Sequence, residues 1–189
     1  MLTKTKAPKK LAELLEGEET GTLQKIERLQ EILVNLRYEG RHRLGKNLKE
    51  ADEVLAFFNG ELAEHVELEE KVIFPFVKSH VPKLEALILM LSSEHEEFRR
   101  NLRSFEFWLG ELAKEKANLD YGRLIEKVRE TGNYLTYLLQ NHLQEESEIL
   151  YRVADQEFRS GEKRELVRRI RERTEQRPPA LRADRPREG

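Results

Sequence analysis

The sequence predicts an all-α protein: an up-down-up-down antiparallel four-helix bundle with an extra C-terminal helix or tail. Three observations support this prediction. Four long segments carry apolar residues three and four positions apart, which is the period of an amphipathic helix. The linkers between these segments are short, so sequential helices are expected to lie antiparallel. Charged residues make up 37% of the chain and hydrophobic residues 38%, a mixture that suits long helices better than strands.

The first two helices are predicted from their apolar stripes, over residues 22–49 and 52–78. The first stripe consists of Leu23, Ile26, Leu29, Leu33 and Leu36, and the second of Leu55, Phe58, Leu62, Val72 and Phe76. A short polar stretch at residues 50–52 separates them and is interpreted as the first turn.

The third helix is expected to begin near Pro82, because proline suits the first turn of a helix. Its stripe is Leu84, Leu87, Leu91, Phe98, Leu102, Phe105 and Leu109. The fourth is expected to begin near Asp120, a good N-cap residue. Its stripe is Leu124, Val128, Leu135, Leu138, Ile149 and Val153. The linkers before these helices are predicted at residues 79–82 and 118–120.

The remaining segments flank the predicted bundle, which spans residues 21–159. Residues 1–20 are rich in Lys and Glu and are interpreted as a loose N-terminal leader. Residues 160–189 are rich in Arg and predict a C-terminal helix, over residues 162–176, followed by a disordered tail. The apolar edge of that helix is short, and a homodimer contact through it is one hypothesis.

Composition and charge exclude several classes of function. The net charge is −2, which gives no reason to expect a nucleic-acid partner. No apolar run is long enough to span a membrane, so we expect no membrane partner and a cytoplasmic location. Cysteine is absent, so disulfides and thiolate metal sites are excluded. Any metal must be bound by imidazole and carboxylate.

Histidines and glutamates occupy positions where the helical period calls for core residues. His95 lies between Leu91 and Phe98 on the third stripe. His65, Glu69, His142 and Glu146 fall on the second and fourth stripes in the same way. Unpaired carboxylates are almost never buried, and a metal ion is the usual reason for finding them in a core.

These residues are also predicted to lie at one level of the bundle. In an antiparallel hairpin, residues equidistant from the turn face each other. The midpoints of the pairs His42–His65, His65–His95 and His95–His142 fall at or next to the three predicted linkers. Each helix would therefore deliver one imidazole to the same cross-section. His80 lies at a turn and is the histidine left out.

The spacing of the ligands favours a site for two metals. In His65-x-x-x-Glu69 and His142-x-x-x-Glu146 the two side chains lie on one helix face and reach a single cluster. Four imidazoles and two carboxylates exceed the four ligands of tetrahedral zinc. They suit two iron ions joined by a bridging oxygen, with manganese the next choice, because both metals accept nitrogen and carboxylate donors.

The motifs resemble those of the hemerythrin-like (HHE cation-binding) family. The segment from His65 to Pro75 resembles the family's His-x-x-x-Glu-Glu-x-x-Leu-Phe-Pro signature, and His142 to Glu146 resembles its closing His-x-x-x-Glu. Glu94-His95 is similar to the third-helix motif. Arg41-His42-Arg43 resembles the first-helix histidine of the branch that repairs iron–sulfur centres under nitrosative stress.

The resemblance implies a non-haem di-iron site that meets O2, NO or peroxide. Its ligands here would be His42, His65, Glu69, His95, His142 and Glu146. Oxygen-carrying relatives use five histidines, so the missing fifth speaks against reversible O2 storage. Tyr38 and Glu39, one turn before His42, are the nearest candidates to replace it.

His42 allows two interpretations, because Gly40 and Gly45 flank it. Each glycine costs a helix about 1 kcal/mol, so the first helix either bends or frays there. Alternatively, the glycines let a neighbour or a small ligand approach the metals.

Three functions therefore compete. The first is a protein that binds or senses O2 or NO, or protects iron centres from them, and is not a dedicated enzyme. The second is a ferritin-like oxidase or peroxidase, for which Glu39-x-x-His42 is the sole Glu-x-x-His pair. The third is a metal-free structural or adaptor bundle.

Overall fold

The computed structural model describes residues 11–114 and 120–175, with side chains from residue 19 onward. Within these ranges the chain is helical and contains no strand, which confirms the all-α prediction. No helix in these ranges has both the length and the apolar character needed to cross a membrane. The prediction of a disordered tail over residues 176–189 lies outside the described residues.

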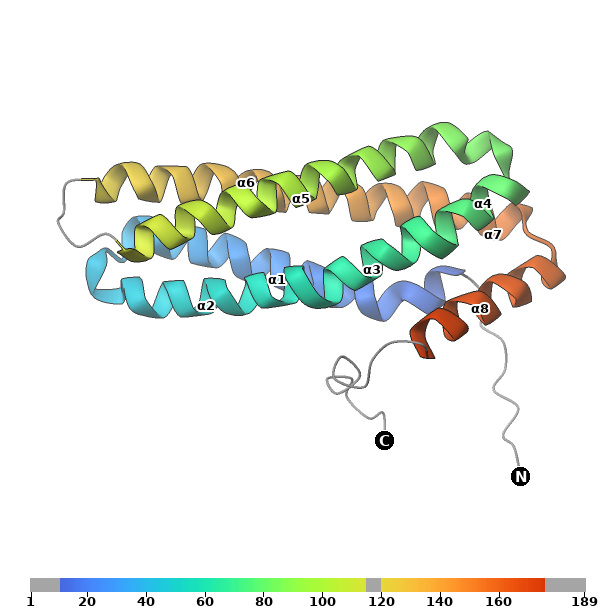
Figure 1. The fold of residues 1–189 in the computed structure, drawn as a ribbon, viewed down its shortest axis with the longest axis horizontal. Coiled ribbons are helices and arrows are strands. Elements are labelled where there is room, and N and C mark those ends of the chain that lie inside the picture. The colour runs from blue at the N-terminus through green and yellow to red at the C-terminus, as the bar shows by residue number, and fades with distance from the viewer. Residues whose placement is uncertain (1–10, 115–119, 176–189) are drawn as a thin grey trace, which may run out of the picture.

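The helices form long rods that lie lengthwise beside one another (Figure 1). The first rod is α1 (Leu11–Tyr38). The second is continuous from α2 (Leu44–Phe57) through α3 (Ala63–Leu68) to α4 (Phe74–His80). The third is α5 (Glu85–Lys114), and the fourth runs from α6 (Tyr121–Glu145) to α7 (Arg152–Glu157). A final helix, α8 (Ser160–Glu175), follows.

The first turn lies about ten residues earlier than predicted. α1 ends at Tyr38, and a 3-10 turn over Arg41–Arg43 leads into α2. Gly40 adopts φ 69°, a left-handed conformation that other residues rarely adopt, so the helix ends here. The predicted turn at residues 50–52 is wrong. The backbone supports the interpretation that the helix is interrupted there, but at Gly40 alone, because Gly45 lies inside α2.

Residues 50–52 look like a linker in the sequence because two of the three are acidic. In the structure Ala51 is completely buried, and Glu50 pairs with Arg28 of α1 at 2.7 Å. The polar stretch is therefore part of a helix that faces α1, and Glu50 forms an ion pair between the two rods.

The predicted leader is also partly helical, because residues 11–20 belong to α1. Thr22, two residues beyond this segment, is 3% exposed, so α1 is packed against the rest of the protein at that point. The helix begins about ten residues before the start of the predicted domain at residue 21. Residues 1–10 lie outside the described residues.

The other predicted boundaries lie close to the observed ones. The second rod ends at His80, and a 3-10 turn over Pro82–Leu84 precedes α5. Asp120 occupies the N-cap position of α6, although its side chain makes no capping hydrogen bond.

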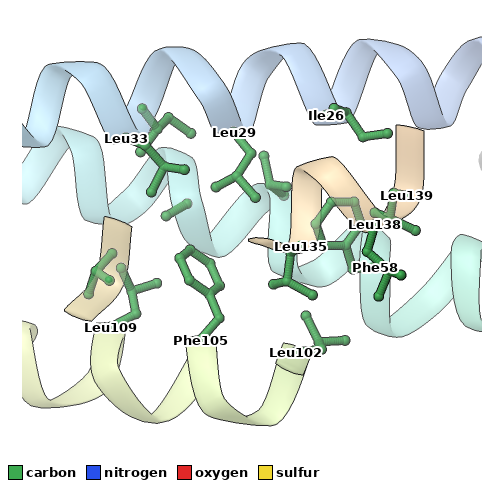
Figure 2. Close-up of a cluster of buried hydrophobic side chains, with 14 of the residues drawn as sticks. Ile26, Leu29, Leu33, Phe58, Leu102, Phe105, Leu109, Leu135, Leu138 and Leu139 are labelled. Carbon is green, nitrogen blue, oxygen red and sulfur yellow. The ribbon is translucent and has the colours of Figure 1, made fainter. Parts of the chain in front are cut away.

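The core consists of two apolar clusters. Figure 2 shows part of the larger one, in which Leu29 and Leu33 of α1 face Phe105 of α5. α6 approaches closely here because it carries Gly132, where a Cβ atom would come within 2.8 Å of Leu33. The second cluster, around Phe76 and Leu150, lies toward the opposite end of the rods.

α8 packs against the second cluster. Leu166 and Ile170 are 1% and 7% exposed, and Arg173 pairs with Glu67 at 3.0 Å. The prediction of a helix at residues 162–176 is confirmed within about two residues. Its apolar edge is covered by its own chain, so it no longer supports a dimer contact.

Candidate metal centre

A belt of buried polar residues separates the two apolar clusters. The second rod contributes His65 and Glu69, α5 contributes His95, and the fourth rod contributes His142 and Glu146. Both glutamates are completely buried, and the three histidines are between 2% and 6% exposed. On each of these three rods, the belt residues lie between residues of the first apolar cluster on one side and residues of the second cluster on the other.

The donor atoms of these residues converge. One ligand atom each from Glu69, His95, His142 and Glu146 lies within 4.8 Å of all the others. The Nε2 atoms of His95 and His142 are 3.0 Å apart. His142 Nε2 lies 3.3 Å from Glu146 Oε1, and His95 Nε2 lies 3.4 Å from Glu69 Oε2. His65 Nε2 lies 3.1 Å from Glu69 Oε1.

Both glutamates stand at the start of a π-helical turn. These turns run over Glu69–Ile73 and Glu146–Tyr151, inside otherwise α-helical rods. A π turn inserts one residue into the helix and is frequently found at functional sites. The two motifs that match in sequence therefore also match in their unusual backbone.

Two of the three imidazoles are each oriented by a different carboxylate, which lies at the ring nitrogen that faces away from the belt. His95 Nδ1 lies 3.0 Å from Glu70, whose carboxylate also accepts two hydrogen bonds from Arg99. His142 Nδ1 lies 2.8 Å from Glu94. Such partners fix the ring and its tautomer so that the other nitrogen, here Nε2, faces the ligand.

His42 lies elsewhere. It belongs to the 3-10 turn after α1, where it is exposed, and it does not join the cluster. The prediction that it shares a level with His65 is wrong because the turn between their rods is at residues 39–43. Tyr38 and Glu39, the candidates to replace a fifth histidine, do not join the cluster either. Tyr38 is 76% exposed, and Glu39 pairs with Arg43 at 2.9 Å. The Glu39-x-x-His42 pair of the ferritin-like alternative therefore lies away from the cluster as well.

The first rod brings a carboxylate toward the belt in place of an imidazole. α1 contains no histidine. One carboxylate oxygen of Glu19 is buried, and its charge acts on the buried Tyr151 of the fourth rod. The predicted set of one imidazole from each rod is thus reduced to imidazoles from three rods.

Three carboxylate oxygens of the belt have no hydrogen-bond donor within the described part of the chain. They are Glu69 Oε2 and both oxygens of Glu146. Buried carboxylate oxygens without donors are costly unless a cation satisfies them. Two carboxylates and three imidazoles form a donor set that fits a transition metal.

The electrostatics of the belt show two carboxylates competing for ionisation. Burial and the charge of Glu69 raise the pKa of Glu146 to about 8. Burial would also raise the pKa of Glu69, but the charge of His65 and the nearby imidazoles of His65 and His95 outweigh it and lower that pKa. Burial opposes protonation of His142, but Glu146 and Glu94 raise its pKa to about 10.

These shifts predict that the metal-free protein loses stability as the pH rises from about 4.5 to 10. Glu146 has its pKa raised from 4.5 to about 8, so the folded state binds more protons in that window. His142 has its pKa raised from 6.5 to about 10, so its contribution is complete below pH 6.5 and is lost as the pH rises through 10. Melting temperatures of chelator-treated protein, measured across this range, test the prediction. A melting temperature that rises from pH 6 to 9 contradicts it.

Sequence reasoning missed several residues of the belt. Tyr151 is completely buried, and its hydroxyl donates a hydrogen bond of 2.5 Å to Glu69 Oε1. Burial, together with the charges of Glu146 and Glu69, raises the pKa of Tyr151, so the phenol remains a donor. Glu94 was visible beside His95, but its partner His142 lies on another rod. No sequence signal indicates either contact.

Comparisons with known proteins give one match. Residues 10–121, more than half of the chain, match the family model described as the hemerythrin HHE cation binding domain. The match begins next to the start of α1, which agrees with the structured residues 11–20. It ends before His142 and Glu146, which the geometry of the structure assigns to the belt. No curated protein and no solved structure matches significantly.

Proposed function

Because the chain belongs to the hemerythrin HHE cation-binding family, we propose that it is a non-haem metalloprotein that holds two iron ions and binds O2 or NO. The observation that carries this proposal is the pair of completely buried carboxylates, Glu69 and Glu146, next to His95 and His142. The family match supports cation binding independently.

We propose His65, Glu69, His95, His142 and Glu146 as the ligands. Five ligand residues exceed the four positions of a tetrahedral zinc site. Imidazole and carboxylate donors together favour iron, with manganese second. The two carboxylates and three imidazoles would hold the metals without filling all of their coordination positions. When bound, the iron supplies the open positions at which a gas molecule can be held.

The chain's own residues prepare this site. Glu70 and Glu94 turn the imidazoles of His95 and His142 so that their Nε2 atoms face each other. The apolar clusters on both sides keep bulk water out, which strengthens electrostatic interactions within the belt. The rods that surround it would form the antiparallel four-helix bundle predicted from the sequence.

A small cavity beside the imidazoles favours a small ligand. It has a volume of about 10 Å³ and is lined by His65, His95 and His142 together with apolar residues that include Phe98 and Leu139. This is close to the minimum of about 10–15 Å³ that one water molecule needs. The space is too small for an organic substrate in this structure, which favours a small ligand held at the metals themselves. Three imidazoles, fewer than the five of an oxygen carrier, favour sensing the gas or protecting iron centres from it over O2 storage.

Iron loading tests the proposal. Anaerobic reconstitution with ferrous iron is expected to give two irons per chain, and NO or air should then produce a new absorption band. His142→Ala should bind less iron, whereas His42→Ala is the matched control and should load like the wild type, because His42 lies outside the belt. Wild-type protein that binds no iron under these conditions overturns the proposal.

A further inference from the structure

Tyr151 makes the two carboxylates of the belt unlike each other. It is the last residue of the π turn that begins at Glu146, and its hydroxyl donates to Oε1 of Glu69 on the second rod at 2.5 Å. The same oxygen lies 3.1 Å from His65 Nε2. Glu69 Oε1 is therefore approached by groups from two different rods.

Glu146 has no equivalent donor. Neither of its oxygens accepts a hydrogen bond from the described residues, and its close ionic neighbour is His142 on the same rod, at 3.3 Å. The residue five positions after Glu69 is Phe74, which corresponds to Tyr151 five positions after Glu146. Phe74 has no hydroxyl, and its ring stacks on His95 at 5.5 Å. One half of the site thus carries a hydroxyl that the other half lacks.

The hydroxyl of Tyr151 is itself firmly placed. The residue is completely buried and belongs to the second apolar cluster, so the ring has little freedom to turn away. A carboxylate on a flexible side chain gains a fixed orientation from such a donor, because one of its oxygens is held while the other points into the belt, toward His95.

We propose that Tyr151 is a positioning residue that holds Glu69 in the orientation in which it binds the metal. This inference rests on the proposed function, since it needs a metal at the belt. Glu69 is then a carboxylate set in advance, whereas Glu146 is free to adjust its position when the metal or the gas binds.

Tyr151→Phe tests the proposal, because it removes a single oxygen atom. Phenylalanine keeps the ring of the completely buried Tyr151, so the apolar packing around it is preserved. Loss of a group that orients a metal ligand typically lowers metal affinity about 10–100-fold, and this is the expected result. The affinity for ferrous iron is measured by competition with a chelator, at a temperature at which both proteins are folded.

The matched control is Tyr134→Phe. The Tyr134 hydroxyl also donates to a carboxylate, that of Glu97, but on the protein surface. This variant is expected to keep wild-type affinity. A second measurement uses cobalt(II), whose visible spectrum reports ligand geometry: Tyr151→Phe should change it and Tyr134→Phe should not.

The possible outcomes separate this inference from the proposed function. If wild-type protein binds no metal, both fail. If it binds metal and Tyr151→Phe has unchanged affinity and an unchanged cobalt spectrum, the proposed function stands and the positioning role is overturned. A tyrosinate-to-iron absorption band in ferric wild-type protein that is absent in Tyr151→Phe also overturns it, because Tyr151 would then bind the metal directly.

Discussion

Replacing Glu69 and Glu146 together by Met is expected to abolish metal binding, and replacing their partners His65 and His142 by apolar residues as well is expected to make the metal-free protein more stable. In that fourfold variant the free energy of unfolding should rise by about 1–4 kcal/mol, as found when buried ionic groups and their partners are replaced together by apolar residues of similar size. Both glutamates are completely buried and lie between two apolar clusters, so methionine side chains would extend the core across the belt.

The physical reason is the cost of two carboxylates in a dry site. Burial, together with the charge of Glu69, raises the pKa of Glu146 to about 8, so the two carboxylates do not easily ionise together. Near neutral pH the metal-free protein therefore holds one of them as a neutral acid or bears the repulsion. Cation binding gives a reason to retain two buried carboxylates, whereas a purely structural core gives none.

Denaturant unfolding of chelator-treated wild-type and variant protein measures the change in stability, and elemental analysis measures metal content. The matched control replaces Glu53 and Glu61, two exposed residues of the second rod, by Met. That control should change the free energy of unfolding by no more than about 0.5 kcal/mol and should keep the metal. A Glu69/Glu146 double variant that still binds metal at wild-type stoichiometry would refute the ligand assignment.

Chelation of the metal is expected to lower the melting temperature by about 8–16 °C when the free metal concentration is about 1,000 times its dissociation constant. Binding at that ratio stabilises the folded state by about 4 kcal/mol, and each kcal/mol shifts the melting temperature of a chain of this size by about 2–4 °C. The effect is large because the ligands come from three rods, so unfolding separates them.

Calorimetry with and without chelator measures this shift. The Glu69/Glu146 double variant serves as its control, since it should melt at one temperature in both conditions. Wild-type protein whose melting temperature is unaffected by chelator, and by added ferrous iron, would favour the metal-free structural bundle.

Local patterns predicted most of the residues that the structure brings together at the belt, because these patterns depend on helix geometry alone. His65 and Glu69, and likewise His142 and Glu146, share a helix face through their spacing of four residues. The apolar stripe then directs that face inward. The cross-section shared by His65, His95 and His142 is predicted from the sequence because the second rod ends, and α5 and α6 begin, close to the predicted positions.

The first turn shows why the rest was not predictable. Moving a turn by about ten residues changes the residue that faces His65 by about twenty positions, or about 30 Å along a helix. The polar stretch at residues 50–52 and the glycines at 40 and 45 are both typical of the end of a helix. A local pattern does not indicate which of them forms the turn. His42 was therefore placed at the belt, and the part of α1 around Glu19 was overlooked.

The sequence by itself determined the helical class, the pairs of His and Glu on one face, and the absence of thiolate ligands, because each follows from composition or from the 3.6-residue period. Only the tertiary structure decided which rods meet at the belt, which carboxylates lie behind the imidazoles, and that the Tyr151 hydroxyl reaches Glu69. Those contacts join residues up to 82 positions apart. They depend on the register between rods, which helical periodicity leaves open. At the first turn, the left-handed Gly40 ends α1 and so affects the register of α1 against the second rod.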